Sequence, residues 1–101
     1  MDPELLRLKG EFVIALDPGA KVDAEVAFRQ AIDIAQRQCS KSWELRAAMS
    51  LARLWRDQGK VKQARELLAP VYGWFTEGFD TLDLRDAKAL LDELGAKREI
   101  G

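Results

Sequence analysis

The side chains that usually carry enzyme chemistry are scarce in this chain of 101 residues. It contains no histidine, which is the commonest general base and metal ligand. Its single cysteine, Cys39, can build neither an internal disulfide nor a thiolate metal site. We interpret Cys39 as an inert, small apolar residue that fills space. The composition therefore argues against an enzyme, and we expect no cofactor and no metal.

Three carboxylates, Asp80, Asp83 and Asp86, recur at a spacing that a bound cation would suit. The segment lacks the glycine and the final glutamate of a calcium-binding loop. Acidic residues are also favoured in the first turn of a helix by its dipole. We therefore interpret these residues as the start of a helix.

A row of basic residues is the stronger candidate for a binding site. Arg46, Arg53 and Arg56 share one face of a predicted helix with Met49. Residues 46–65 contain six basic side chains and one acidic one, a local balance of +5, although the whole chain has a net charge of −1. Guanidinium groups bind carboxylates in a bidentate manner, so an acidic peptide would suit this face. The alternative is that these arginines form a solvated face or pair with acids of the first hairpin, such as Glu4 and Glu11.

The elements that must position these arginines are helices. Apolar residues recur at steps of three and four and predict helices at about 3–16, 21–38, 42–58, 60–76 and 82–94. Ser40 or Ser42 can cap the third helix, and Gly59 can end it in a left-handed conformation. Pro70 predicts a kink in the fourth helix, and Gly95 predicts the end of the fifth. No segment alternates with a period of two, so the predicted fold is all-α.

Two of these helices carry the same pattern forty residues apart. Ala24, Phe28 and Ala31 correspond to Ala64, Leu68 and Val71. We therefore predict a single domain made of hairpin one (about 3–38), hairpin two (about 42–76) and a C-terminal capping helix (about 82–94). Stacked hairpins form an extended surface, which favours a binding module over an enclosed reaction cavity.

The repeated pattern resembles the tetratricopeptide repeat. The matching positions in hairpin two are Leu51, Ala52, Trp55, Gly59, Ala64, Leu68 and Val71. Residues 4–35 resemble a poorer copy through Leu6, Gly10, Val13, Ala24, Phe28 and Ala31, with Lys9 where a large apolar residue is usual. The resemblance implies an α-solenoid fragment whose groove, lined by the first and third helices, binds partners. Arg46, Met49, Arg53 and Arg56 would then project into that groove.

A narrower resemblance concerns the C-terminal tail of large bacterial signalling ATPases that carry nucleotide-cyclase or winged-helix domains. It rests on Arg-Leu-Lys-Gly near residue 7, Phe-Arg-Gln-Ala at 28, Lys-Ser-Trp-Glu-Leu-Arg-Ala at 41 and Tyr-Gly-Trp-Phe-Thr-Glu-Gly-Phe-Asp at 72. The resemblance implies the repeat region of a signalling or regulatory protein. It implies no catalysis here, because the chain contains no phosphate-binding glycine loop.

Aromatic residues gather near the end of hairpin two: Tyr72, Trp74, Phe75 and Phe79. We expect them to clamp the capping helix over the end of the stack. The alternative is an exposed anchor for another subunit or a peptide. Trp43 raises the same question.

These observations together favour a cytoplasmic protein-interaction module that binds a protein or peptide, with an acidic peptide as one candidate. The alternative is a homo-oligomerisation element, with the exposed faces of terminal repeats as the contact. The net charge gives no general attraction for nucleic acid, no apolar run is long enough to cross a membrane, and the start of the chain does not resemble a secretory signal.

Overall fold

The computed structural model describes residues 3–17, 19–75 and 82–96, and all secondary structure in these ranges is helical. The five helices are α1 (Pro3–Leu16), α2 (Lys21–Arg37), α3 (Lys41–Asp57), α4 (Val61–Trp74) and α5 (Leu82–Ala96). The all-α prediction is confirmed, and the predicted helix ends lie within about two residues of the observed ones.

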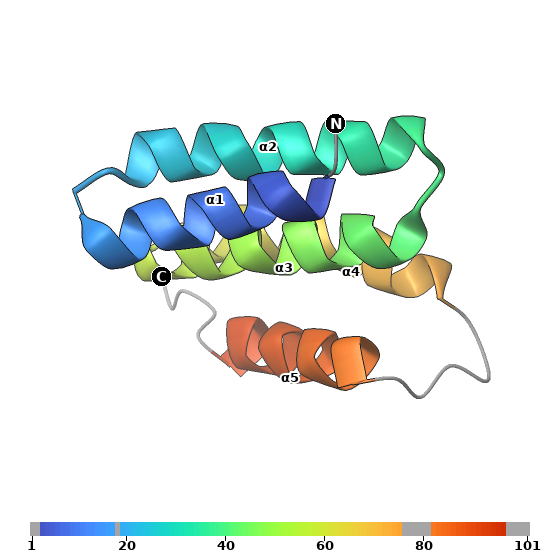
Figure 1. The fold of residues 1–101 in the computed structure, drawn as a ribbon. Helices are drawn as coiled ribbons and strands as arrows, with labels where there is room; N and C mark the ends of the chain where they lie inside the picture. The colour runs from blue at the N-terminus through green and yellow to red at the C-terminus, as the bar shows by residue number, and fades with distance from the viewer. Residues whose placement is uncertain (1–2, 18, 76–81, 97–101) are drawn as a thin grey trace.

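The helices pack in the order in which they occur along the chain (Figure 1). Hairpin one consists of α1 and α2, and hairpin two consists of α3 and α4. In addition, α3 packs between α1 and α5, so that these three helices form one layer. This layer carries the predicted arginines, and α2 and α4 support it. The arrangement is a stack of consecutive helical hairpins, as the internal repeat predicts.

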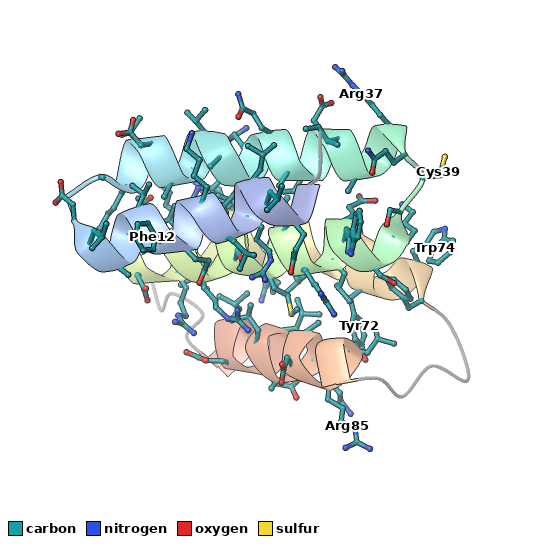
Figure 2. All side chains as sticks on the ribbon, in the orientation of Figure 1. Phe12, Arg37, Cys39, Tyr72, Trp74 and Arg85 are labelled. Carbon is teal, nitrogen blue, oxygen red and sulfur yellow. The ribbon has the colours of Figure 1, made fainter. Side chains whose placement is uncertain are left out.

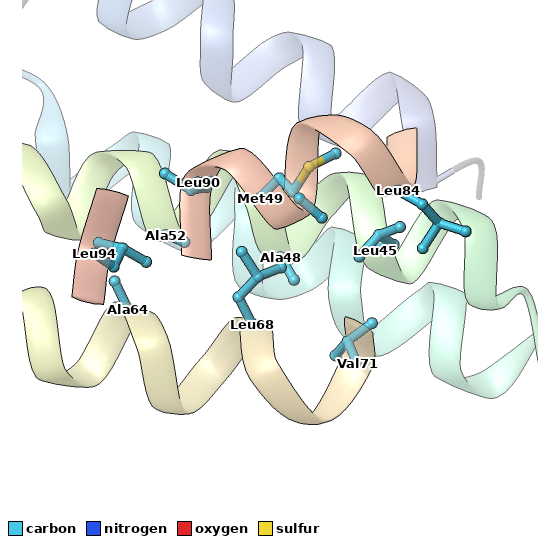
Figure 3. Close-up of a cluster of buried hydrophobic side chains, with 11 residues drawn as sticks. Leu45, Ala48, Met49, Ala52, Ala64, Leu68, Val71, Leu84, Leu90 and Leu94 are labelled. Carbon is cyan, nitrogen blue, oxygen red and sulfur yellow. The ribbon is translucent and has the colours of Figure 1, made fainter. Parts of the chain in front are cut away.

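Small residues on one face of each helix allow this close packing. Ala24, Ala31, Ala52 and Ala64 are all fully buried, and the largest cluster joins α3, α4 and α5 (Figure 3). That cluster consists of Leu45, Ala48, Met49, Ala52, Ala64, Leu68, Val71, Leu84, Ala87, Leu90 and Leu94. A second cluster joins the two hairpins through Ala24, Phe28, Leu51 and Leu54.

Gly10 allows α1 to approach α2 closely. A Cβ atom at this position would lie 2.6 Å from Cε1 of Phe28, whose ring is fully buried. The position therefore tolerates no side chain without movement of the ring.

The ends of two helices use left-handed residues. Gly59 has φ +83° after α3, as predicted. Cys39 has φ 55° after α2, and the amide of Ser40 donates to the carbonyl of Ala35 at 2.8 Å. This geometry turns the thiol outward, and Cys39 is exposed. The prediction that Cys39 fills space in the interior is therefore wrong, because the residue has the conformation of a helix C-terminus.

Other predicted helix signals differ in detail. Ser40 occupies the N-cap position of α3, but its side chain makes no capping hydrogen bond. Pro70, by contrast, lies within α4 without ending it, as expected. The helix α5 continues through Gly95 to Ala96, so Gly95 does not end it as predicted. No helix in the described ranges is both long and apolar enough to cross a membrane.

Candidate interaction surface on α3

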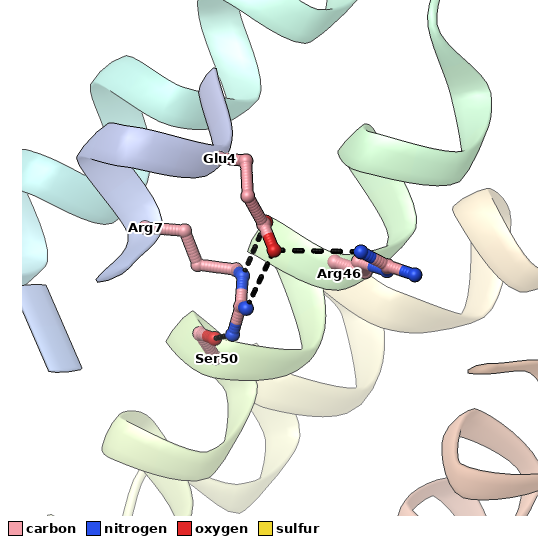
Figure 4. A network of polar contacts seen from close by, with 4 residues as sticks. All are labelled: Glu4, Arg7, Arg46 and Ser50. Carbon is pink, nitrogen blue, oxygen red and sulfur yellow. Dashed lines mark hydrogen bonds and ion pairs between the residues drawn. The ribbon is translucent and has the colours of Figure 1, made fainter. Parts of the chain in front are cut away.

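The predicted arginine row lies on α3 between α1 and α5, and its first member bridges to hairpin one. Arg46 contacts Glu4 of α1 at 3.4 Å, and Arg7 contacts the same carboxylate at 2.7 and 2.9 Å (Figure 4). Arg7 also donates to the hydroxyl of Ser50 at 3.4 Å. The hydrogen bond from Arg7 holds the pKa of Glu4 below its usual value, with a further contribution from Arg46. Arg46 is therefore already engaged within the protein.

Arg56 forms the corresponding contact on the other side of α3. Its guanidinium donates to both carboxylate oxygens of Glu93 on α5, at 3.1 and 3.2 Å, and contacts Asp57 at 3.3 Å. Arg46 and Arg56 thus tie α3 to its two neighbours in the layer. This supports the alternative that the arginines pair with acidic residues of neighbouring helices, although one acid comes from α5 and was not foreseen.

Arg53 is the arginine that differs. It is half-buried, and no hydrogen bond or ion pair joins it to any residue within 3–17, 19–75 and 82–96. Glu11, the other acid proposed to pair with this face, is exposed and likewise has no such contact in these ranges.

A surface cavity of about 270 Å³ lies beside Arg53, between α3 and α5. Its lining combines two cations with two carboxylates and an apolar floor: Arg53, Arg56, Asp86, Ala89, Leu90 and Glu93. The local charge of +5 counted along the sequence is therefore not the charge of this surface, because α5 brings Asp86 and Glu93 to the arginines. A ligand carboxylate can approach the guanidinium of Arg53 from the solvent.

Met49 does not share this surface. Its side chain is only 4% exposed and belongs to the core cluster under α5. The expectation that Met49 contacts a ligand therefore does not hold, because α5 packs over its position. The cavity beside Arg53 is bounded by α3 and α5, whereas the sequence predicts a groove lined by the first and third helices.

The predicted aromatic cluster divides into buried and exposed members. Tyr72 and Phe75 are partly buried and pack against the core cluster that includes Leu84 of α5, which agrees with a clamping role. Trp74 is 56% exposed, contacts Phe75 edge to face at 5.1 Å, and has the ammonium of Lys41 5.5 Å from its ring (Figure 2).

The remaining aromatic predictions concern two positions. Trp43 is half-buried at the start of α3. Phe79 lies outside the described residues. The clamping role therefore rests on Tyr72 and Phe75. The alternative, an exposed anchor for another subunit or a peptide, rests on Trp74.

One polar link between the hairpins was not predicted. The indole Nε1 of Trp55 donates to Glu25 of α2 at 2.9 Å, and Arg29 lies 5.4 Å from the centre of the same ring. The hydrogen bond from Trp55 lowers the pKa of Glu25, with a further contribution from Arg29. Trp55 itself is the sequence signal for this link, because a partly buried tryptophan needs a hydrogen-bond acceptor for its N–H group.

The described residues contain no group of three or more histidine, cysteine, aspartate or glutamate side chains able to hold a metal ion. Comparison of the chain with protein-family models, with curated proteins and with solved structures found no match in any of the three.

Proposed function

We propose that this chain is a protein-interaction module that binds an acidic peptide segment at the cavity between α3 and α5. The observation that carries the proposal is Arg53, a half-buried guanidinium without a partner in the described ranges, at the edge of a cavity of about 270 Å³. An arginine so placed can donate two parallel hydrogen bonds to one carboxylate.

The neighbouring groups would set the register of such a peptide. Leu90 and Ala89 provide an apolar floor for a side chain next to the bound carboxylate. Asp86 and Glu93 border the same cavity and would repel a second carboxylate placed beside them. The site therefore favours a single acidic residue flanked by apolar ones over a continuous acidic run.

The resemblance to the tetratricopeptide repeat and to the tails of bacterial signalling ATPases supports a regulatory, cytoplasmic setting for this binding. In that setting the chain acts by association and performs no catalysis of its own.

The test is a binding titration with fluorescently labelled peptides, measured by polarisation. One peptide carries a single glutamate between apolar residues, and a second carries glutamine at that position. We expect Arg53→Ala to weaken binding of the glutamate peptide about tenfold or more, because a hydrogen bond to a charged group contributes about 1.5–3 kcal/mol. The glutamine peptide should bind weakly to both proteins.

Arg37→Ala is the matched control, since Arg37 is an exposed arginine of α2 that pairs with Asp33. It should leave the affinity unchanged. Equal affinities of the wild type and Arg53→Ala for the glutamate peptide would refute the proposed site.

A further inference from the structure

Hairpin one exposes an apolar surface that has no equivalent elsewhere in the described residues. Six of the seven large hydrophobic side chains that are strongly exposed there lie on α1 and α2. We call them the N-terminal face: Leu5 (64%), Leu8 (48%), Phe12 (64%), Leu16 (71%), Val22 (76%) and Val26 (50%). A concentration of exposed apolar side chains of this kind marks an interaction surface.

The internal repeat shows which kind of element packs on such a face. Gly10 corresponds to Ala52, an offset of 42 residues, and the same offset relates Leu5, Leu8 and Phe12 to Ala47, Ser50 and Leu54. In hairpin two these counterparts are at most 5% exposed.

The counterparts are buried because hairpin one covers them. Ala47 packs with Leu6 and Ala31, and Leu54 packs with Phe28. The N-terminal face is therefore the surface on which a helical hairpin packs in this fold.

The other end of the stack is unsuited to fill it. The exposed side chains of α5 are mostly charged, and Arg85 projects away from the helices (Figure 2). A head-to-tail contact would place these charges against Phe12 and Leu16. Contact between two N-terminal faces instead buries apolar surface on both sides, which is the arrangement of a two-fold symmetric dimer.

The charged residues on this face are arranged so that they can pair with those on the same face of a second copy. A cavity of about 410 Å³ between α1 and α2 is lined by Leu6, Val13, Val26, Ala27 and Gln30, with Lys9 from α1 and Asp23 from α2. Neither Lys9 nor Asp23 has a hydrogen bond or ion pair in the described part of the chain. A two-fold axis between the helices would bring Lys9 of one copy to Asp23 of the other, twice.

From this arrangement we infer that the N-terminal face docks a second copy of the chain in a two-fold symmetric dimer. Phe12 and Val26 supply the apolar contact, and Lys9 and Asp23 form the reciprocal ion pairs. The inference does not rest on the proposed function, because this surface lies on α1 and α2 and the peptide cavity lies between α3 and α5.

Sedimentation equilibrium of the purified chain over a range of concentrations is the first test. The wild type should form a dimer and no larger species, and Phe12→Glu should weaken dimerisation at least tenfold. Because Phe12 is 64% exposed, its replacement should leave the helical circular-dichroism spectrum unchanged. Trp74→Glu is the matched control, since Trp74 is 56% exposed at a different site, and it should dimerise like the wild type.

A charge exchange tests the symmetry. Lys9→Asp and Asp23→Lys should each weaken dimerisation about twofold to fivefold, as expected for an exposed pair. The double variant should regain the wild-type dissociation constant, because both reciprocal pairs are restored with reversed polarity.

Three results would overturn the inference. One is a wild type that stays monomeric at all concentrations, including one that captures only a foreign helical peptide on this face. Another is equal weakening by Phe12→Glu and Trp74→Glu. The last is a double variant weaker than either single variant. Peptide binding through Arg53 should be retained in Phe12→Glu, so failure of the dimer and failure of the peptide site are distinguishable.

Discussion

Hairpins one and two follow the same plan, but only hairpin two is covered on both sides. In hairpin two, Leu54 is 5% exposed beneath hairpin one, and Leu68 is fully buried against α3 and α5. In hairpin one, the counterpart of Leu54 is Phe12, which is 64% exposed. The difference shows that position in the stack, and not the residue pattern alone, decides which stripes become core.

The two hairpins also solve the same packing problem with different residues. Hairpin one pairs Gly10 with Phe28, and hairpin two has Ala52 and Leu68 at the corresponding positions. A smaller residue on the first helix thus accompanies a larger one on the second. The combined volume is nearly conserved, as close packing requires.

Replacing the Gly10 and Phe28 pair by the residues of hairpin two should give the largest changes in the free energy of unfolding. Gly10→Ala should destabilise the fold by about 1–3 kcal/mol, because the new Cβ would lie 2.6 Å from the buried Phe28 ring. Phe28→Leu alone should also destabilise it, by leaving a cavity. The double variant Gly10→Ala/Phe28→Leu recreates the arrangement of hairpin two and should lie within about 1 kcal/mol of the wild type. Urea unfolding of all four proteins measures these free energies.

The decisive result of that experiment is the sign of the coupling energy between Gly10→Ala and Phe28→Leu. Volume compensation requires the double variant to be more stable than at least one of the single variants. Purely additive losses would show that the two hairpins do not share this packing rule.

The contact between the hairpins should respond to loss of its polar link. Trp55→Phe removes the donor that bonds to Glu25 at 2.9 Å and should cost about 1–2 kcal/mol. We place the loss at the low end for a bond to a charged group, because Glu25 is 26% exposed and water can replace the indole. A double-mutant cycle with Glu25→Ala, followed by urea unfolding, should give a coupling energy of about 1 kcal/mol.

If the two losses simply add, the hydrogen bond contributes nothing and Trp55 acts only by packing. Leu67→Ala is a useful companion, because Leu67 packs against the same cluster without a polar group. Its loss should not depend on Glu25.

Sequence periodicity was sufficient to predict the helices, because each helix buries apolar residues that recur at the helical period. Gly59 was also predictable, since a left-handed helix end favours glycine. The left-handed conformation of Cys39 was not predictable, because cysteine is not a residue type that indicates such a helix end. Cys39 is exposed because it lies in the turn that follows α2.

The candidate site was only partly predictable. The spacing of Arg46, Arg53 and Arg56 places them on one helix face whatever the neighbours are. Which arginine stays unpaired depends on where Glu4 and Glu93 arrive from other helices, and that is a property of tertiary packing. Met49 was misplaced for the same reason, because its burial depends on α5.

Acid should weaken the contacts that Glu4 and Glu25 make in the fold. The pKa values of Glu4 and Glu25 are both lowered in the fold from 4.5, and both residues bond to α3. A lowered pKa means that the carboxylate form is stabilised by folding, so this contribution is present above pH 4.5 and is lost as the pH falls through the lowered values.

We therefore expect the double variant Glu4→Gln/Glu25→Gln to lose less stability than the wild type between pH 7 and pH 3, by about 1 kcal/mol in total. Thermal unfolding at a series of pH values measures the difference. Glu11→Gln is the matched control, because Glu11 is exposed and has no ion pair in the described ranges. A parallel acid response of the double variant and the wild type would show that these carboxylates do not stabilise the fold.

The smallest expected effect lies at the two helix ends that share a left-handed residue. Cys39→Gly should stabilise the fold by about 0.5 kcal/mol, because the relief of about 1 kcal/mol at φ 55° exceeds the added flexibility of the unfolded chain. Gly59→Ala is the reverse experiment at φ +83° and should destabilise it by about 1 kcal/mol. Differential scanning calorimetry of both variants measures the two shifts. Cys39→Ala separates backbone from thiol: it keeps the strained conformation and should unfold at the wild-type temperature, whereas stabilisation equal to that of Cys39→Gly would assign the effect to the side chain.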